Sequence, residues 1–143
     1  MSGNISSSVS QPNTITTTNN PVPSSSSVSL SNLNQYNDVT SVTITAGTWM
    51  VSGSVGISIG TMIIPTSVMG GLATSSGTTA TGLVIGVNGG TSGPPTIGYD
   101  AVISIPNSFY TVTQSTILYL KASAACTSGI GLAYGNIIAL KTA

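Results

Sequence analysis

The stretch that most constrains the fold of this chain is residues 45–59, in which two kinds of side chain alternate. From Trp49 onward the odd positions carry mostly large apolar residues, and the even positions after Met50 carry serine or glycine. A period of two places these sets on opposite faces of an extended strand, whereas a helix would need apolar residues three and four apart. We therefore expect a long strand with one face in the hydrophobic core. Its expected core residues are Trp49, Val51, Val55 and Ile57.

The same texture of short alternating runs continues from residue 39 to the end of the chain. Clusters of glycine, asparagine, serine and proline separate the runs and are typical of turns. The expected strands are 40–45, 48–60, 66–73, 81–88, 96–105, 109–113, 115–124 and 128–141. Roughly eight strands in about 105 residues, with no convincing helix, predict an all-β fold, an antiparallel jelly roll or β-sandwich.

Residues 1–38 differ from the rest, because serine, threonine, asparagine, glutamine and proline dominate them. Such a segment has too little apolar surface to repay the entropy of ordering it alone. It is either a flexible linker or an extended arm that lies along a partner and places isolated side chains in pockets. We expect an arm over 1–38 and a knob over 39–143. The expected partner-binding residues of the arm are Ile5, Val9, Ile15, Val22, Val28, Leu30, Leu33 and Tyr36.

Charge is almost absent from this chain of 143 residues: 3% are charged, and His, Arg and Glu do not occur. Soluble domains average about 25% charged residues. A neutral surface promotes association, so we expect an oligomer, with a monomer hydrated by hydroxyl groups as the alternative. Two lysines do not form the basic patch that phosphate binding requires, and no nucleic-acid partner is expected.

No membrane partner is expected either. The longest apolar region, 49–64, is interrupted by serine and glycine and is shorter than the roughly 20 residues of a spanning helix. No basic segment precedes an apolar run at the start of the sequence, so no signal peptide is expected. The single Cys126 cannot form an internal disulfide, and we expect it to be a packing residue.

The residue types needed for catalysis are missing. General acid–base chemistry needs histidine or paired carboxylates, and the chain has only Asp38 and Asp100. No base is present to activate a serine. The glycine-rich segments 53–60 and 129–135 lack the spacing and the lysine of nucleotide-binding loops. We therefore expect no enzyme, no cofactor and no metal site, with a calcium ion at Asp100 and loop carbonyls as the remaining alternative.

Three segments together resemble a known family. They are residues 42–55, which include Thr45-Ala46-Gly47-Thr48-Trp49-Met50-Val51-Ser52-Gly53, then residues 115–124, and last residues 132–139. In this order they are similar to the opening and closing strands of a domain found in structural proteins of tailed bacteriophages. The resemblance implies a trimeric jelly roll of the tumour-necrosis-factor-like or complement-like type, placed on phage heads or fibres, and implies no catalytic residue.

The last two expected strands suggest where such a trimer would form. In 115–124 both faces carry apolar residues, which indicates a core on one side and a subunit interface on the other. The expected interface residues near the threefold axis are Ile117, Tyr119, Tyr134 and Ile138.

These observations lead to a non-enzymatic virion protein, located on the capsid exterior. We expect a decoration (cement) protein, a homotrimer whose arm binds the major capsid protein and stabilises the lattice. The alternative is the receptor- or glycan-binding tip of a head or tail fibre, which would bind host glycan through loops near 88–95. Tyr99, Tyr110 and Trp49 are the aromatics that would stack on sugar, although each is also a candidate for the core. A glycan depolymerase lacks the paired carboxylates it would need.

Overall fold

The computed structural model describes residues 16–32, 34–58, 67–78, 84–87 and 100–143. Nearly all of its regular structure is β-strand, with one short 3₁₀ turn, η1. The elements are β1 (Thr17–Asn19), η1 (Ser24–Ser26), β2 (Val28–Leu30), β3 (Tyr36–Ile44), β4 (Gly47–Ser58), β5 (Ser67–Ala73), β6 (Val84–Val87), β7 (Asp100–Val112), β8 (Thr116–Ala125) and β9 (Gly131–Lys141).

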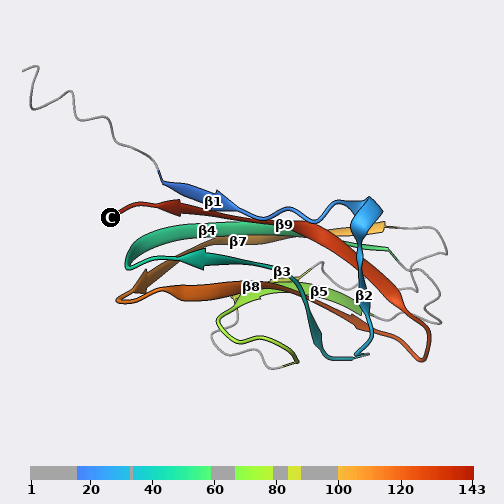
Figure 1. The fold of residues 1–143 in the computed structure, drawn as a ribbon. Helices are drawn as coiled ribbons and strands as arrows, with labels where there is room; N and C mark the ends of the chain where they lie inside the picture. The colour runs from blue at the N-terminus through green and yellow to red at the C-terminus, as the bar shows by residue number, and fades with distance from the viewer. Residues whose placement is uncertain (1–15, 33, 59–66, 79–83, 88–99) are drawn as a thin grey trace, which may run out of the picture.

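The strands form two stacked antiparallel sheets (Figure 1). One sheet has the order β1-β9-β4-β7, with β2 also paired to β9, and the other has the order β3-β8-β5-β6. Most connections cross from one sheet to the other, so that strands adjacent in sequence lie in different layers. This is jelly-roll connectivity, and the expected all-β sandwich is confirmed.

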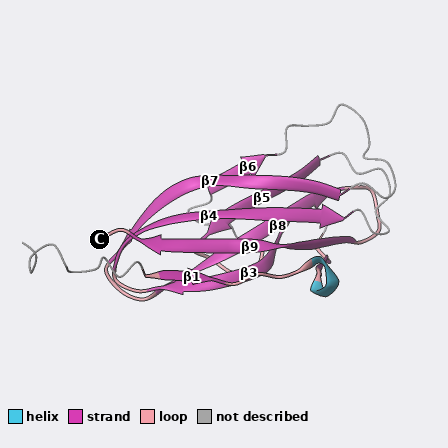
Figure 2. Ribbon diagram, turned by 90° about the horizontal axis from the view of Figure 1, so that it is seen from above, coloured by secondary structure: helices cyan, strands magenta, loops and turns pink. Residues whose placement is uncertain are grey.

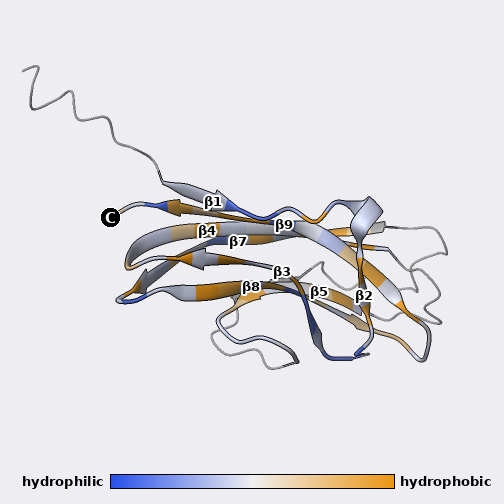
Figure 3. Ribbon diagram, viewed as in Figure 1, coloured by the Kyte–Doolittle hydropathy of each residue, from blue (hydrophilic) through white to orange (hydrophobic). Residues whose placement is uncertain are grey.

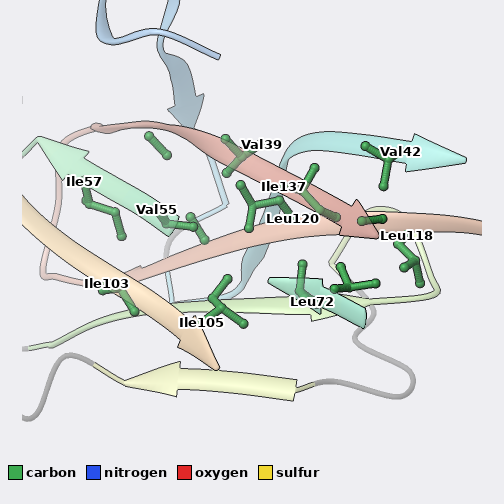
Figure 4. Close-up of a cluster of buried hydrophobic side chains, with 14 of the residues drawn as sticks. Val39, Val42, Val55, Ile57, Leu72, Ile103, Ile105, Leu118, Leu120 and Ile137 are labelled. Carbon is green, nitrogen blue, oxygen red and sulfur yellow. The ribbon is translucent and has the colours of Figure 1, made fainter. Parts of the chain in front are cut away.

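The core lies between the two sheets and is built mainly from inward-facing residues of β3, β4, β7, β8 and β9, with Leu30 of β2 and Leu72 of β5 (Figure 4). Trp49 closes one end of it: its side chain is 2% exposed, and its Nε1 donates to the carbonyl oxygen of Thr45 at 2.8 Å. The ammonium group of Lys141 lies 5.8 Å from the centre of the Trp49 ring, a favourable cation–π distance. The four residues expected in the core from the alternation of β4 are all buried: Trp49, Val51, Val55 and Ile57.

β7 differs from the expectation. The sequence predicted separate strands over 96–105 and 109–113, whereas the structure has one strand, Asp100–Val112, paired along β4. The pairing shifts between Ile105 and Ser108, where two residues of β7 lie opposite one residue of β4. Pro106 sits in this bulge, which tolerates a residue without a backbone N–H. Ending one expected strand at residue 105 and beginning the next at 109 was therefore wrong.

The N-terminal segment lies against the sandwich. β1, a bridge between Val22 and Gly135, and β2 follow one another along β9, and together they take the place of one edge strand (Figure 1). β3 begins at Tyr36, so the boundary expected at residue 38 falls inside a strand. The described part of the expected arm thus completes the jelly roll on its own chain.

Candidate interaction surfaces

The outer face of the β9-β4-β7 layer carries two rows of apolar side chains. Met50 of β4 pairs with Phe109 of β7 on one side and with Leu140 of β9 on the other. Six residues further along β4, Gly56 pairs with Val102 and with Tyr134 in the same way. Residues directly opposite in neighbouring strands share a face, so each set forms a row across the sheet. Figure 2 shows the three strands side by side.

Much of this face is open to solvent. Phe109 is 68% exposed, Val102 is 61% exposed and Ile138 is 44% exposed. These are three of the five large hydrophobic side chains that are exposed among the residues with described side chains. The strand segments between and including the two rows, 50–56, 102–109 and 134–140, contain no charged residue. An exposed apolar patch without charges is typical of a protein–protein contact.

The middle strand of the face carries mainly small residues. Ser52, Ser54 and Gly56 follow Met50 on the outer side of β4. The Tyr134 ring lies over Gly56 so closely that a Cβ atom added there would collide with it. The glycine is therefore needed for the tyrosine to lie flat across β4.

The opposite sheet has a different outer face. On β8, Leu118 and Leu120 are fully buried in the core, so Ile117, Tyr119 and Lys121 point to the outside. Ile117 is 44% exposed, and Tyr119 is half-buried. Lys121 is fully buried on this outer side, because the turn after β5 covers it.

Lys121 is held by the only ion pair found among the described residues. Its Nζ donates to Oδ1 of Asp38 at 2.5 Å and to the carbonyl oxygen of Gly77 at 2.7 Å, and it lies 5.6 Å from the centre of the Tyr119 ring. The second oxygen of Asp38, Oδ2, accepts from the backbone N–H of Gly77 at 2.7 Å. One carboxylate and one ammonium group thus fasten the turn around residue 77 to β3 and β8. We assign this cluster a structural task.

The structure separates the four expected interface residues into two pairs. Tyr134 and Ile138 lie on the outer face of β9, where Tyr134 belongs to one of the two apolar rows and Ile138 lies between the rows. Ile117 and Tyr119 lie on the outer face of the other sheet. Strand alternation shows which residues share a face of one strand, but it does not show which sheet the strand joins. Phe109, Val102 and Met50, which share this outer face with Tyr134 and Ile138, could not be added to the expected set for this reason.

The eight residues expected to bind a partner through the arm also fall into two groups, four within the described sandwich and four outside the described residues. Leu30 is 1% exposed and belongs to the core, and Val22 packs against the core from the edge of the sheet. Val28 and Tyr36 are half-buried in β2 and β3. The remaining four lie outside the described residues: Ile5, Val9, Ile15 and Leu33.

The aromatics proposed for sugar stacking are mostly in the sandwich. Trp49 is buried, and Tyr110 packs against the core with its hydroxyl out of contact with solvent. Tyr99 and the loop 88–95 lie outside the described residues.

Cys126 is a free, buried thiol. Asp100, considered for calcium, pairs through its backbone with Ser58, and the described residues contain no cluster of three His, Cys, Asp or Glu. No helix in the described part of the chain is long and apolar enough to cross a bilayer.

Comparison with solved structures finds the same fold in a viral capsid protein. The VP2 subviral particle of infectious bursal disease virus aligns with a TM-score of 0.56 and 15% identity, over 90% of this chain and 33% of that chain. T=1 particles derived from the same virus give a TM-score of 0.58 and 16% identity, over 90% and 32%. The T13 particle gives a TM-score of 0.54 and 16% identity, over 87% and 31%.

The chain spans about a third of the length of these capsid chains. At this level of identity the likeness shows the fold alone. No family model matches the sequence, and no curated protein matches it.

Proposed function

We propose that this chain is a non-enzymatic structural protein of a virion, a decoration (cement) protein that binds the outside of the capsid as a homotrimer. The observation that carries the proposal is the uncharged apolar face of β9, β4 and β7 on a jelly-roll sandwich. The sequence resemblance to phage structural domains and the fold shared with VP2 support a virion role. The lack of histidine and of paired carboxylates argues for structure rather than catalysis.

The apolar face supports the trimer. Phe109, Val102 and Ile138 would leave water when a second copy covers them, at a gain of about 25 cal/mol for each Å² of apolar surface. Their neighbours carry no charge, so like copies meet there without repulsion. In a cyclic trimer each subunit presents one surface to the next and a different one to the previous. Ile117 and Tyr119, on the opposite sheet, can therefore still contribute to the same assembly.

The contact with the major capsid protein is assigned to the start of the chain. Residues 17–19, Val22 and residues 28–30 pair with β9 of their own chain, so we assign the apolar anchors of a capsid-binding arm to Ile5, Val9 and Ile15. A ligand that binds only the assembled lattice stabilises that lattice by mass action. Three arms on one trimer add avidity, because the second and third contacts are intramolecular.

The test is deletion of the gene from the virus that encodes it. We expect capsids that assemble but release their genome at a lower temperature, and addition of the purified protein should restore the wild-type release temperature. Protein lacking residues 1–15 should not restore it. Deletion particles with wild-type heat stability would overturn the cement role. If such particles also failed to adsorb to host cells, the receptor-binding tip would be favoured instead.

A further inference from the structure

Residues 17–30 run along β9 and form an edge segment of the sheet. An insertion within this segment interrupts its pairing with β9. β1 pairs Thr17 with Leu140, and the same register continues to the bridge between Val22 and Gly135. The pairing resumes with Val28 opposite Ala133. From Gly135 to Ala133, β9 advances two residues, while the edge segment advances six, from Val22 to Val28. Four residues are therefore extra, and they leave the sheet through the η1 turn, which projects at the edge in Figure 2.

The register also shows which backbone groups face away from the sheet. Lys141 N donates to Thr16 O, Asn20 N donates to Ile137 O, and Val22 exchanges two hydrogen bonds with Gly135. The even-numbered residues therefore direct their N–H and C=O groups to β9. In an antiparallel ladder the residues between them direct theirs to the opposite side. Pro21 is one of these outward-facing residues, and Pro23 is the next in phase, just before the insertion.

A proline at an outward-facing position costs no hydrogen bond to β9, because its missing N–H would have pointed to solvent. It does remove a donor that another strand would need in order to add to this edge. Directly after Pro23, the four-residue insertion interrupts the regular register that an added strand would have to match. Pro23, Ser24, Ser25 and Ser26 are all exposed.

The neighbouring edge of the other sheet is capped as well. β3 is an outer strand of its sheet, and its Ser41 carbonyl oxygen accepts from Nδ2 of Asn20 at 3.0 Å. The side chain of Asn20, the residue before Pro21, thus occupies one backbone acceptor of β3. The two edges on this side of the sandwich are tied to each other by this bond.

This arrangement replaces the protection that charges give in other proteins. Natural sheets commonly keep edge strands from pairing by placing lysine or other charged residues on them. This chain has four charged residues in all, and the segment 16–32 has none. We propose that Pro21, Pro23 and the four-residue insertion block this edge against the addition of a strand from a second copy of the chain. The inference does not depend on the proposed virion role.

The test restores the uninterrupted strand. A variant that lacks residues 23–26 and carries Pro21→Thr aligns Val28 with Ala133 in the register of β1 and returns an outward N–H at position 21. We expect it to associate edge to edge, so that its mass by light scattering reaches at least twice the wild-type mass at the same concentration. Backbone amides of Thr17 and Asn19 should exchange more slowly with solvent. The matched control is Ser24→Ala/Ser25→Ala/Ser26→Ala, which keeps the insertion and should keep the wild-type mass.

A folded deletion variant with the wild-type mass at every concentration would overturn the proposal. Circular dichroism separates this result from loss of the fold. If the deletion variant does not fold, Pro21→Thr/Pro23→Thr serves as the second variant, because it keeps the chain length and the insertion. We expect a smaller, concentration-dependent rise in mass from the two added donors. A wild-type mass for this variant would then overturn the proposal.

Discussion

Tyr110 shows how a single side chain can make the stability of the fold depend on pH. It lies in β7 and packs against the core, and its hydroxyl is buried with no hydrogen-bond partner within the described part of the structure. Burial raises the pKa of Tyr110 above its usual value of 10.0, because the phenolate would be poorly solvated there. A buried polar group without a partner costs about 1–3 kcal/mol.

Tyr110→Phe should therefore raise the free energy of unfolding by about 1 kcal/mol at pH 7. The folded-state pKa lies above the unfolded one, so stability is full below pH 10.0 and is lost as the pH rises through the folded pKa. The variant should lose less stability than the wild type between pH 9 and pH 11, as measured by urea unfolding. Tyr119→Phe, at a half-buried position on the outer face, is the control. A less stable Tyr110→Phe variant at pH 7 would mean that the hydroxyl has a partner.

At the scale of the elements, the ion pair of Lys121 and Asp38 joins β3, β8 and the turn around residue 77. Asp38→Asn leaves the buried ammonium group without its counterion, which costs more than the pair itself contributes. Because the Asp38 side chain is 32% exposed, we expect a loss of about 2 kcal/mol in the free energy of unfolding, below the range for fully buried pairs. Replacing both charges, with Asp38→Asn and Lys121→Met, should recover most of this loss. Urea titration of the single and the double variant measures their free energies of unfolding. Equal values for the two variants would contradict this account.

The individual strands could be predicted where side-chain alternation determines them. β4, β8 and β9 lie within two to three residues of their expected bounds, and the large inward residues of β4 are buried. β1 and β2 could not be predicted in this way, because backbone hydrogen bonds to β9 hold them and only Leu30 and Val22 contact the core. The break expected between residues 105 and 109 was wrong for a similar reason, since the bulge at Pro106 follows from the pairing with β4 and not from a side-chain pattern.

The candidate interface depended on information that local sequence does not hold. Ile117 and Ile138, both expected in one subunit interface, are exposed apolar residues, yet they lie on opposite sheets. Which strands become neighbours is decided by the connectivity of the whole jelly roll. Only this connectivity brings Phe109 of β7 beside Met50 of β4 and Leu140 of β9. The hydropathy of each strand, visible in Figure 3, can be read from the sequence, whereas the rows across strands cannot.

At the scale of the whole molecule, the described residues of the N-terminal segment contribute to the sandwich. The described contacts begin at Thr16, whose carbonyl oxygen accepts from Lys141 N at 2.9 Å, and they include the buried side chain of Leu30. Removal of residues 1–15 leaves every one of these contacts in place. Removal of residues 1–30 takes away the edge strand and uncovers the backbone of β9.

Two truncations should therefore separate stability from capsid binding. We expect the chain without residues 1–15 to melt within about 2 °C of the full chain, since it keeps the whole sandwich. The chain without residues 1–30 loses a core leucine, a change that typically costs about 2–5 kcal/mol, together with the hydrogen bonds of β1 and β2, and should melt at least about 10 °C lower. Thermal unfolding followed by circular dichroism measures both. Equal melting temperatures for the two truncations would mean that residues 16–30 are dispensable for the fold, and the jelly roll would then begin at β3.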